Sequence, residues 1–190
     1  MTTKQRKTKM KKIMIALAAV ALAVSAQAAA FNWKTGMGGQ VYGPDSTTTA
    51  NGMVAYLFDA AVTSQSAAFA ALSSGTAVTE IAGGLDSATL ANGAIKTQTA
   101  FNWGNAGDTL SAYFVVVNGD NFYISTEQSA LGDAAATATI QFKEKATSQA
   151  ALNTSGAYAG AGWYTAVPEP TSGLLMLVGL AGLALRRRRA

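Results

Sequence analysis

Positive charge in this chain is concentrated at its two ends, and each basic cluster adjoins a short apolar run. Ten of the 14 Lys and Arg residues lie in residues 4–12 and 186–189. Residues 29–166 contain only four lysines and nine acidic residues, which gives a formal charge of −5, against +4 for the whole chain. A nucleic-acid-binding domain needs a basic surface, so we expect no nucleic-acid partner. The chain divides into residues 1–28, 29–166 and 167–190.

Residues 1–28 have the order of a secretory signal peptide. A basic segment comes first, and the uncharged, mostly apolar residues 13–24 follow it. A helix of this length rises about 18 Å at ~1.5 Å per residue, which is short of the ~30 Å hydrocarbon core of a bilayer. We therefore expect a signal peptide that is cleaved, and not an uncleaved anchor. The expected route is the Sec translocase followed by signal peptidase.

Small residues after the apolar run define the expected cleavage site. Signal peptidase accepts small side chains at the third and first positions before the cut. Ala26 and Ala28 fit these positions, with cleavage before Ala29. A second register uses Ala28 and Ala30 and cuts before Phe31.

The other end of the chain carries a second apolar segment in a different arrangement. Pro168 and Pro170 favour an extended conformation for residues 167–170, because each proline lacks an N–H and disfavours helix in the residue before it. Residues 171–185 are uncharged and are expected to form a hydrophobic helix. Four arginines then act as cytoplasmic stop charges, namely Arg186, Arg187, Arg188 and Arg189. Basic residues beside an apolar helix mark the cytoplasmic side, so residues 29–166 are expected outside.

A Val-Pro-Glu-Pro sequence, a short Gly- and Leu-rich segment and a terminal Arg cluster resemble the PEP-CTERM sorting signal of exopolysaccharide-producing, Gram-negative-type bacteria. The resemblance covers residues 167–190. In that family an exosortase, an integral-membrane Cys protease, reads the signal and removes the tail near the motif. The resemblance implies that Pro168, Glu169 and Pro170 are recognition residues and that the catalytic groups belong to the partner. A plain tail anchor is the alternative.

Residues 29–166 are expected to form a mainly β domain, an antiparallel β-sandwich with one short helix. The clearest strand is residues 109–118, which are rich in β-branched and aromatic residues, and it is expected to be central. The Asn118-Gly119 pair before residues 121–126 predicts a hairpin. Other strands are expected at residues 53–58, 94–101 and 137–144, with weaker candidates at 39–42, 77–81 and 163–166.

A helix and a short repeat complete the pattern. Residues 63–72 predict a helix whose apolar face is formed by Ala68, Phe69 and Leu72. The sequence Ala-Phe-Asn-Trp at residues 30–33 recurs at residues 100–103. The flanks of the two copies do not match, so we interpret the recurrence as chance or local reuse and not as duplication.

The composition leaves few routes to catalysis. The chain has no Cys and no His, which excludes thiol catalysis, disulfides, ordinary zinc sites and His-based acid–base chemistry. We find no phosphate-binding loop, dinucleotide fingerprint or calcium loop, so no cofactor and no metal is expected. The sequence favours a non-catalytic protein of the cell surface or extracellular matrix, formed from an inner-membrane-anchored precursor.

Two alternatives belong to other functional classes. A carbohydrate-binding module would use Trp33 and Trp103, which can stack on sugar rings if they are exposed, with extracellular polysaccharide as the partner. A carboxylate-based glycosidase would need two acidic side chains about 5–10 Å apart in a cleft. The nine acids of residues 29–166 allow many such pairs.

Overall fold

The computed structural model describes residues 27–143, 152–153 and 156–166. The predicted signal helix and the predicted C-terminal hydrophobic helix lie outside these residues. Within the described part of the chain, no helix is both long and apolar enough to cross a bilayer.

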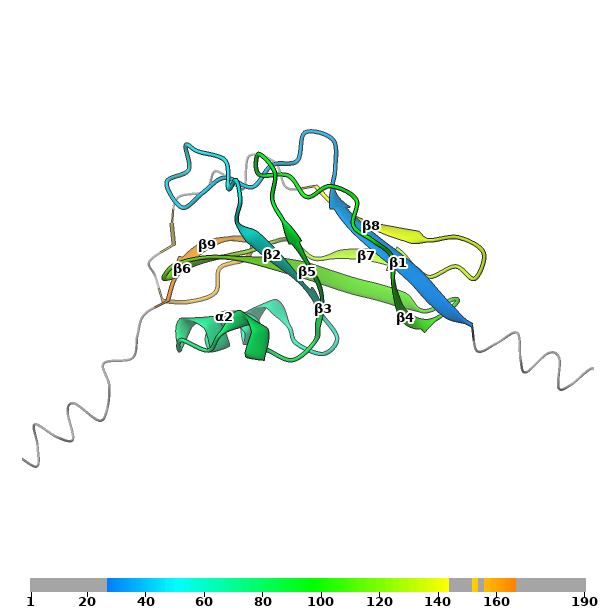
Figure 1. Cartoon of the computed structure of the whole chain (residues 1–190). Helices are drawn as coiled ribbons and strands as arrows, with labels where there is room; N and C mark the ends of the chain where they lie inside the picture. Colours follow the sequence, from blue (N-terminus) through cyan, green and yellow to red (C-terminus); the bar gives the residue numbers. More distant parts are fainter. Residues whose placement is uncertain (1–26, 144–151, 154–155, 167–190) are drawn as a thin grey trace, which may run out of the picture.

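Two β-sheets pack face to face, as the sequence predicts, and one short helix covers the outer face of the larger sheet (Figure 1). The strands are β1 (Ala28–Thr35), β2 (Val54–Asp59), β3 (Gly84–Thr89), β4 (Phe101–Asn105), β5 (Thr109–Asn118), β6 (Asn121–Ile124), β7 (Gln128–Leu131), β8 (Ala138–Phe142) and β9 (Gly162–Thr165). The smaller sheet has the order β4-β1-β8, and the larger has the order β3-β2-β5-β6-β9, with β7 paired to the start of β5. All pairs are antiparallel except β1 with β8.

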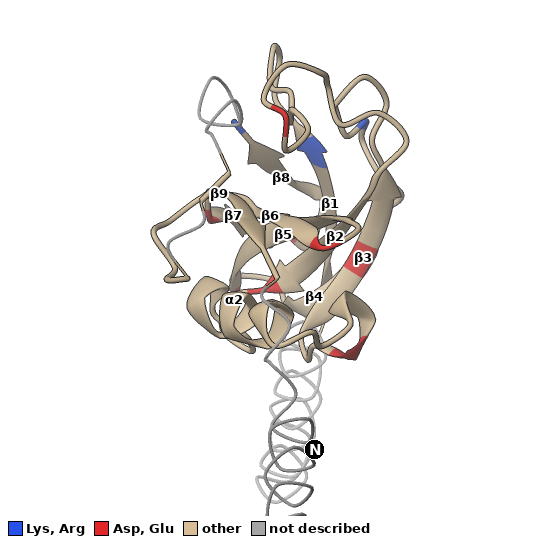
Figure 2. Cartoon of the chain, turned by 90° about the vertical axis from the view of Figure 1, so that its left-hand side faces the viewer, with Lys and Arg blue, Asp and Glu red and all other residues tan. Residues whose placement is uncertain are grey.

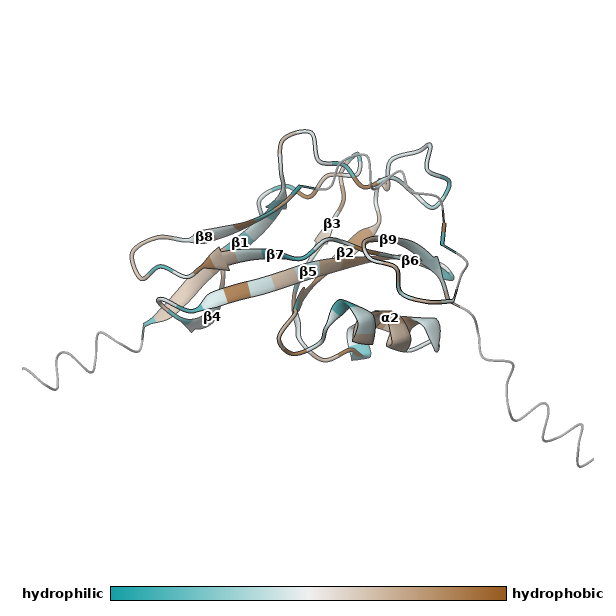
Figure 3. Ribbon diagram, turned by 180° about the vertical axis from the view of Figure 1, so that it is seen from behind, coloured by the Kyte–Doolittle hydropathy of each residue, from teal (hydrophilic) through white to brown (hydrophobic). Residues whose placement is uncertain are grey.

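Strand β5 is the central element, as its sequence predicts. Its even-numbered side chains, such as Phe114 and Val116, enter the core between the sheets. Its odd-numbered side chains Tyr113 and Val115 enter a second core beneath the helix. The predicted hairpin is confirmed, because Asn118 pairs with Asn121 across a two-residue turn. Colouring by hydropathy shows alternating bands along β5, which are typical of a strand with two different faces (Figure 3).

Helix α2 (Gln65–Ser73) confirms the predicted helix. The hydroxyl of Ser64 accepts a hydrogen bond from the backbone N–H of Ala67, which satisfies one of the free donors at the helix start. The predicted apolar face is also confirmed, because Ala68, Phe69 and Leu72 are its buried residues. The helix thus closes the second core.

The structure corrects several sequence predictions. Residues 94–100 form no strand, and β4 begins only at Phe101. This segment contacts β1 at Ile95 and Gln98, whose partners are Thr35 and Trp33. Three residues of the segment therefore span two residues of β1, and a regular ladder cannot form. The weak candidate at 77–81 is a 3-10 turn, η1 (Val78–Glu80), and 39–42 contributes only an isolated bridge from Tyr42.

The two Ala-Phe-Asn-Trp copies lie side by side in the fold. They form the antiparallel pair β1–β4, with Phe31 opposite Phe101. The rings of these two residues stack at 6.3 Å, and Phe31 meets Trp103 edge-on at 5.8 Å. The recurring sequence therefore occupies two neighbouring, paired strands.

Each tryptophan of this repeat bonds to an acid on the opposite sheet. The indole Nε1 of Trp33 donates to Asp86 Oδ2 at 2.7 Å, and that of Trp103 donates to Asp59 Oδ2 at 2.9 Å. Asp86 belongs to β3 and Asp59 to β2, so these two indole–carboxylate bonds join the sheets at separate places. The other oxygen of Asp59 accepts from the N–H of Ala61 at 2.9 Å. A buried carboxylate needs such donors, and Asp59 is only 4% exposed.

Replacing Asp59 with Asn should destabilise the sandwich. The amide offers one acceptor oxygen where the carboxylate offers two, so either Trp103 or Ala61 loses its partner. Hydrogen bonds to charged groups contribute about 1.5–3 kcal/mol, and we expect D59N to lower the free energy of unfolding by a similar amount. Urea unfolding of the purified protein measures this. E80Q, an equivalent change at an exposed residue of η1, should have no measurable effect, and an equal loss in both variants would contradict the prediction.

Candidate functional site

The described chain ends where strand β9 completes the larger sheet. β9 pairs with β6 from Gly162 to Thr165. One further bond follows, because the N–H of Ala166 donates to the carbonyl of Asp120 at 2.7 Å. The hydroxyl of Thr165 also donates to Asn121 Oδ1 at 3.0 Å. The fold therefore holds the chain up to Ala166.

Two aromatic side chains fix β9 from both of its faces. Trp163 is fully buried in the core between the sheets, and its indole N–H donates to the carbonyl of Tyr42 at 2.7 Å. Tyr164 points to the other side, where it stacks on Phe122 at 5.7 Å and meets Phe69 edge-on at 4.9 Å. Large buried aromatic side chains contribute strongly to a core, so β9 is a firmly packed strand.

Most of the predicted processing residues lie outside the described residues. These are Ala26, Pro168, Glu169, Pro170, Arg186, Arg187, Arg188 and Arg189. Ala28 is described and is the exposed first residue of β1, whereas Ala29 is fully buried. The start of β1 and the end of β9 lie at opposite ends of the molecule (Figure 1).

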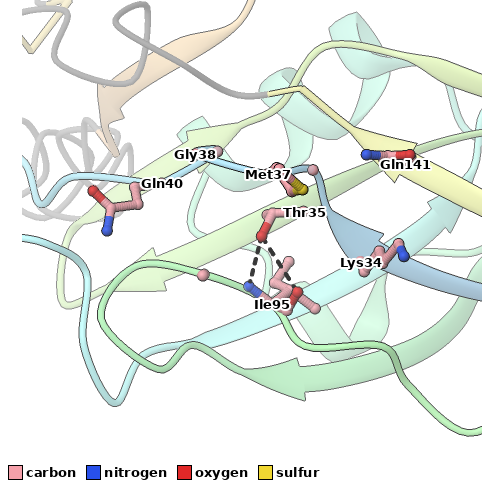
Figure 4. Close-up of a pocket in the computed structure, with 10 residues that line it drawn as sticks. Lys34, Thr35, Met37, Gly38, Gln40, Ile95 and Gln141 are labelled. Carbon is pink, nitrogen blue, oxygen red and sulfur yellow. Dashed lines mark hydrogen bonds between the residues drawn. The ribbon is translucent and has the colours of Figure 1, made fainter.

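A shallow cup lies at the end of β1, with a volume of about 280 Å³. Its lining comes from the chain after β1, from β8 and from the Ile95 region (Figure 4). The hydroxyl of Thr35 donates to the carbonyl of Ile95 and accepts from its N–H, which holds two sides of the cup together. The lining residues are Lys34, Thr35, Gly36, Met37, Gly38, Gly39, Gln40, Ala94, Ile95 and Gln141. None of these is aromatic or acidic, so the cup offers neither a sugar-stacking ring nor a glycosidase carboxylate.

The structure does not leave Trp33 available for a glycan. Trp33 is 0% exposed, and its ring meets Phe142 and Phe114 in the core. Trp103 is partly buried, packs on the same core and uses its only polar hydrogen on Asp59. Both side chains link the sheets; Trp33 has no exposed surface for a sugar ring, whereas part of Trp103 stays exposed.

Several carboxylates of the described body hold their own turns. Asp45 accepts from the Thr48 hydroxyl and from the N–H groups of Thr47 and Thr48. These hydrogen bonds, led by the one from the Thr48 hydroxyl, lower the pKa of the exposed Asp45 to about 2. Asp108 accepts from the N–H of Asn105, and Asp133 accepts from that of Ala135. Figure 2 shows the basic residues of the described chain, in blue, at separate places on the same end of the molecule.

Beside helix α2, the outer face of β5 and β7 carries a small polar cluster. The Ser111 hydroxyl donates to Glu127 Oε1 at 2.5 Å and lies 2.8 Å from the Ser129 hydroxyl. Tyr113 follows on the same face of β5, and its buried hydroxyl has no hydrogen-bond partner among the described residues. Burial raises the pKa of Tyr113 above its ordinary value, and Tyr158 and Glu127 add to this effect. Burial also raises the pKa of Tyr158.

Comparison with known protein families assigns the segment that begins where this fold ends. Residues 166–189 match the family model described as the PEP-CTERM protein-sorting motif. The chain carries a PEP-CTERM sorting signal. No curated protein and no solved structure matches the chain significantly, and residues 29–165 have no family assignment.

The structure adds a junction that sequence reasoning did not find. The first residue of the PEP-CTERM match, Ala166, is also the last residue that the structure describes, and its N–H donates to the larger sheet at Asp120. Its partner Asp120 lies in the β5–β6 turn, which the Asn-Gly signal did locate. The pairing of that turn with residue 166 had no local signal, because it depends on which strand lies beside β6.

Replacing Tyr113 with Phe should make the free energy of unfolding less sensitive to alkaline pH. The raised pKa means that the folded state keeps the tyrosine proton at a pH where the unfolded chain loses it, so stability falls as pH rises above about 10. Y113F should therefore show a shallower fall between pH 9 and 11. It also removes an unpartnered hydroxyl, so at pH 7 it should be neutral or more stable by about 1 kcal/mol. Urea unfolding across this pH range tests both points, and an unchanged slope would contradict the first.

Proposed function

We propose that this chain is an exported, non-catalytic protein of the bacterial cell surface or extracellular matrix, delivered through its PEP-CTERM signal by a membrane exosortase. The observation that carries the proposal is the match of residues 166–189 to the sorting motif, directly after the last strand of the body. The order of the N-terminal residues supports entry through the Sec translocase and removal of a signal peptide. The four terminal arginines support a precursor held in the inner membrane with its body outside.

In the proposed sorting step the chain is a substrate. A peptide bond near Pro168, Glu169 and Pro170 breaks, and the tail leaves with a new amino group that carries the added proton. The acyl end of the body passes to the thiol of the exosortase, and then to water or to a hydroxyl or amine acceptor. The body supplies no catalytic group to this sequence.

Several observations support a non-catalytic body. The Asp59 and Asp86 carboxylates hold indole groups between the sheets, and Glu127 is bonded to Ser111. A glycosidase would need two carboxylates free to face a substrate. The cup near β1 is lined by glycines, two amides, aliphatic groups, one threonine, one methionine and one lysine, and by no acid. A small body of this kind, with few charged residues and many hydroxyl groups, suits a matrix component that contacts extracellular polysaccharide.

Replacing Pro168, Glu169 and Pro170 with Ala should leave an unprocessed precursor. Without the rigid prolines and the carboxylate, the exosortase has no motif to bind, and the full tail stays in the membrane. Immunoblots of membrane and released fractions would show the longer form in the membrane, with at least a tenfold fall in the processed form. T171A/S172A, a change in the adjacent residues, serves as the matched control and should be processed normally. Normal processing of the triple variant would contradict the proposal.

The fold also favours one of the two signal-peptidase registers. A cut before Ala29 keeps the pairs of Ala29 with Trp103 and of Ala30 with Asn102, whereas a cut before Phe31 removes both. Ala29 is fully buried, and a Cβ added at Gly132 would lie 2.6 Å from the Ala29 Cβ. Residue 29 is therefore part of the core.

N-terminal sequencing of the exported protein should give Ala29 as the first residue. A form that begins at Phe31 loses backbone hydrogen bonds and the buried Ala29 methyl group, so its free energy of unfolding should fall by about 2 kcal/mol. Denaturant unfolding of the two forms compares them directly. A form beginning at Phe31 that is as stable as the form beginning at Ala29 would contradict this reasoning.

A further inference from the structure

The described part of β9 ends beside the turn that joins β5 to β6. In an antiparallel ladder, the residues that bond to one neighbour recur at every second position. Ala166 donates its N–H to Asp120, so the next donor on that edge would come from residue 168. Residue 168 is Pro and has no N–H to donate. In the β6–β9 register, residue 168 would also face residue 118, which belongs to β5 on the other side of the turn, so β6 offers no further partner at that position.

This leaves a very short connection to the sorting motif. Only Val167 separates the bonded Ala166 from Pro168. A fully extended chain spans at most about 3.3–3.6 Å per residue, so Pro168 lies within about 7 Å of Ala166. An enzyme that binds the Pro-Glu-Pro sequence must therefore approach the exposed β5–β6 turn at Gly119 and Asp120 closely.

Strand β9 has no slack to lengthen this connection. Releasing residues from its end would break the bonds of Ala166 to Asp120 and of Thr165 to Asn121. Releasing one more residue would pull Tyr164 from its stack on Phe122 and from its contact with Phe69. Unpairing residues at the end of β9 to lengthen the connection would therefore cost stability.

We propose that the folded body sets the reach of the sorting signal, so that the length of chain between Ala166 and Pro168 controls processing by the exosortase. This inference rests on the proposed function and adds a steric rule to it. With one residue between Ala166 and Pro168, the enzyme can bind the motif beside the β5–β6 turn. With none, the motif would lie against the sheet and could not be bound. The rule also places the cut beyond the Ala166–Val167 bond, since residues up to 166 are held by the fold.

Two variants of the full chain separate length from sequence at residue 167. One deletes Val167, and the other replaces Val167 with Gly-Ser-Gly-Ser. Both changes lie beyond the last described residue, so the body is the same in each. In pulse-chase labelling of cells that produce an exosortase, the deletion should slow processing at least tenfold. The Gly-Ser-Gly-Ser chain should be processed at least as fast as the wild type, although it lacks the valine side chain.

Three results would overturn the inference. The first is wild-type processing of the deletion variant. The second is equally slow processing of both variants, which would mean that the enzyme reads the valine side chain and not the length. The third is a mature protein whose intact mass places its last residue at or before Ala166, which would mean that β9 opens. Failure of the proposed function has a different signature, since the wild-type chain itself would then keep its tail.

Discussion

Two indole–carboxylate hydrogen bonds between the sheets are the interaction on which the rest of this structure depends. The inter-sheet core contains many small residues, and a smaller sheet of three strands must be held in register over a larger one. Trp33 and Trp103 contribute large apolar rings and also help to fix the position of the sheets, because each indole N–H donates to an acid on the opposite sheet. The cost of burying Asp59 is offset by these donors, and a misplaced sheet would leave the carboxylate without them.

The strands that the sequence predicts well are those whose signal is local. The β5–β6 hairpin combines a β-branched run with an Asn-Gly turn, and β8 alternates Ile140 and Phe142 with polar residues. Strands β1, β3 and β7 lack that signal, since they are rich in Ala, Ser, Asn and Gly and owe their conformation to their neighbours. Residues 94–100 have a local strand signal but form no strand. Their contacts at Ile95 and Gln98 are three residues apart, whereas the partners on β1 are two residues apart.

The functional site divides in the same way. The sorting motif is read from the sequence because its order of proline, acid, apolar residues and arginines is contiguous. The way in which the motif is attached to the body cannot be read from the sequence, since the hydrogen bond from Ala166 to Asp120 joins residues 46 apart. The two tryptophans were proposed as glycan contacts from residue type alone, and only the fold shows that their rings are packed and their N–H groups used.

The start of β1 and the end of β9 lie at opposite ends of the sandwich, and this arrangement gives the precursor a polarity (Figure 1). In the proposed precursor, where the tail holds the end of β9 near the bilayer, the start of β1 would lie on the side away from the membrane. A reporter or affinity domain joined ahead of Ala29 would therefore be displayed on the distal side, clear of the enzyme that works at the proximal one. In that proposed precursor, the sandwich would separate the membrane from whatever its amino-terminal end meets.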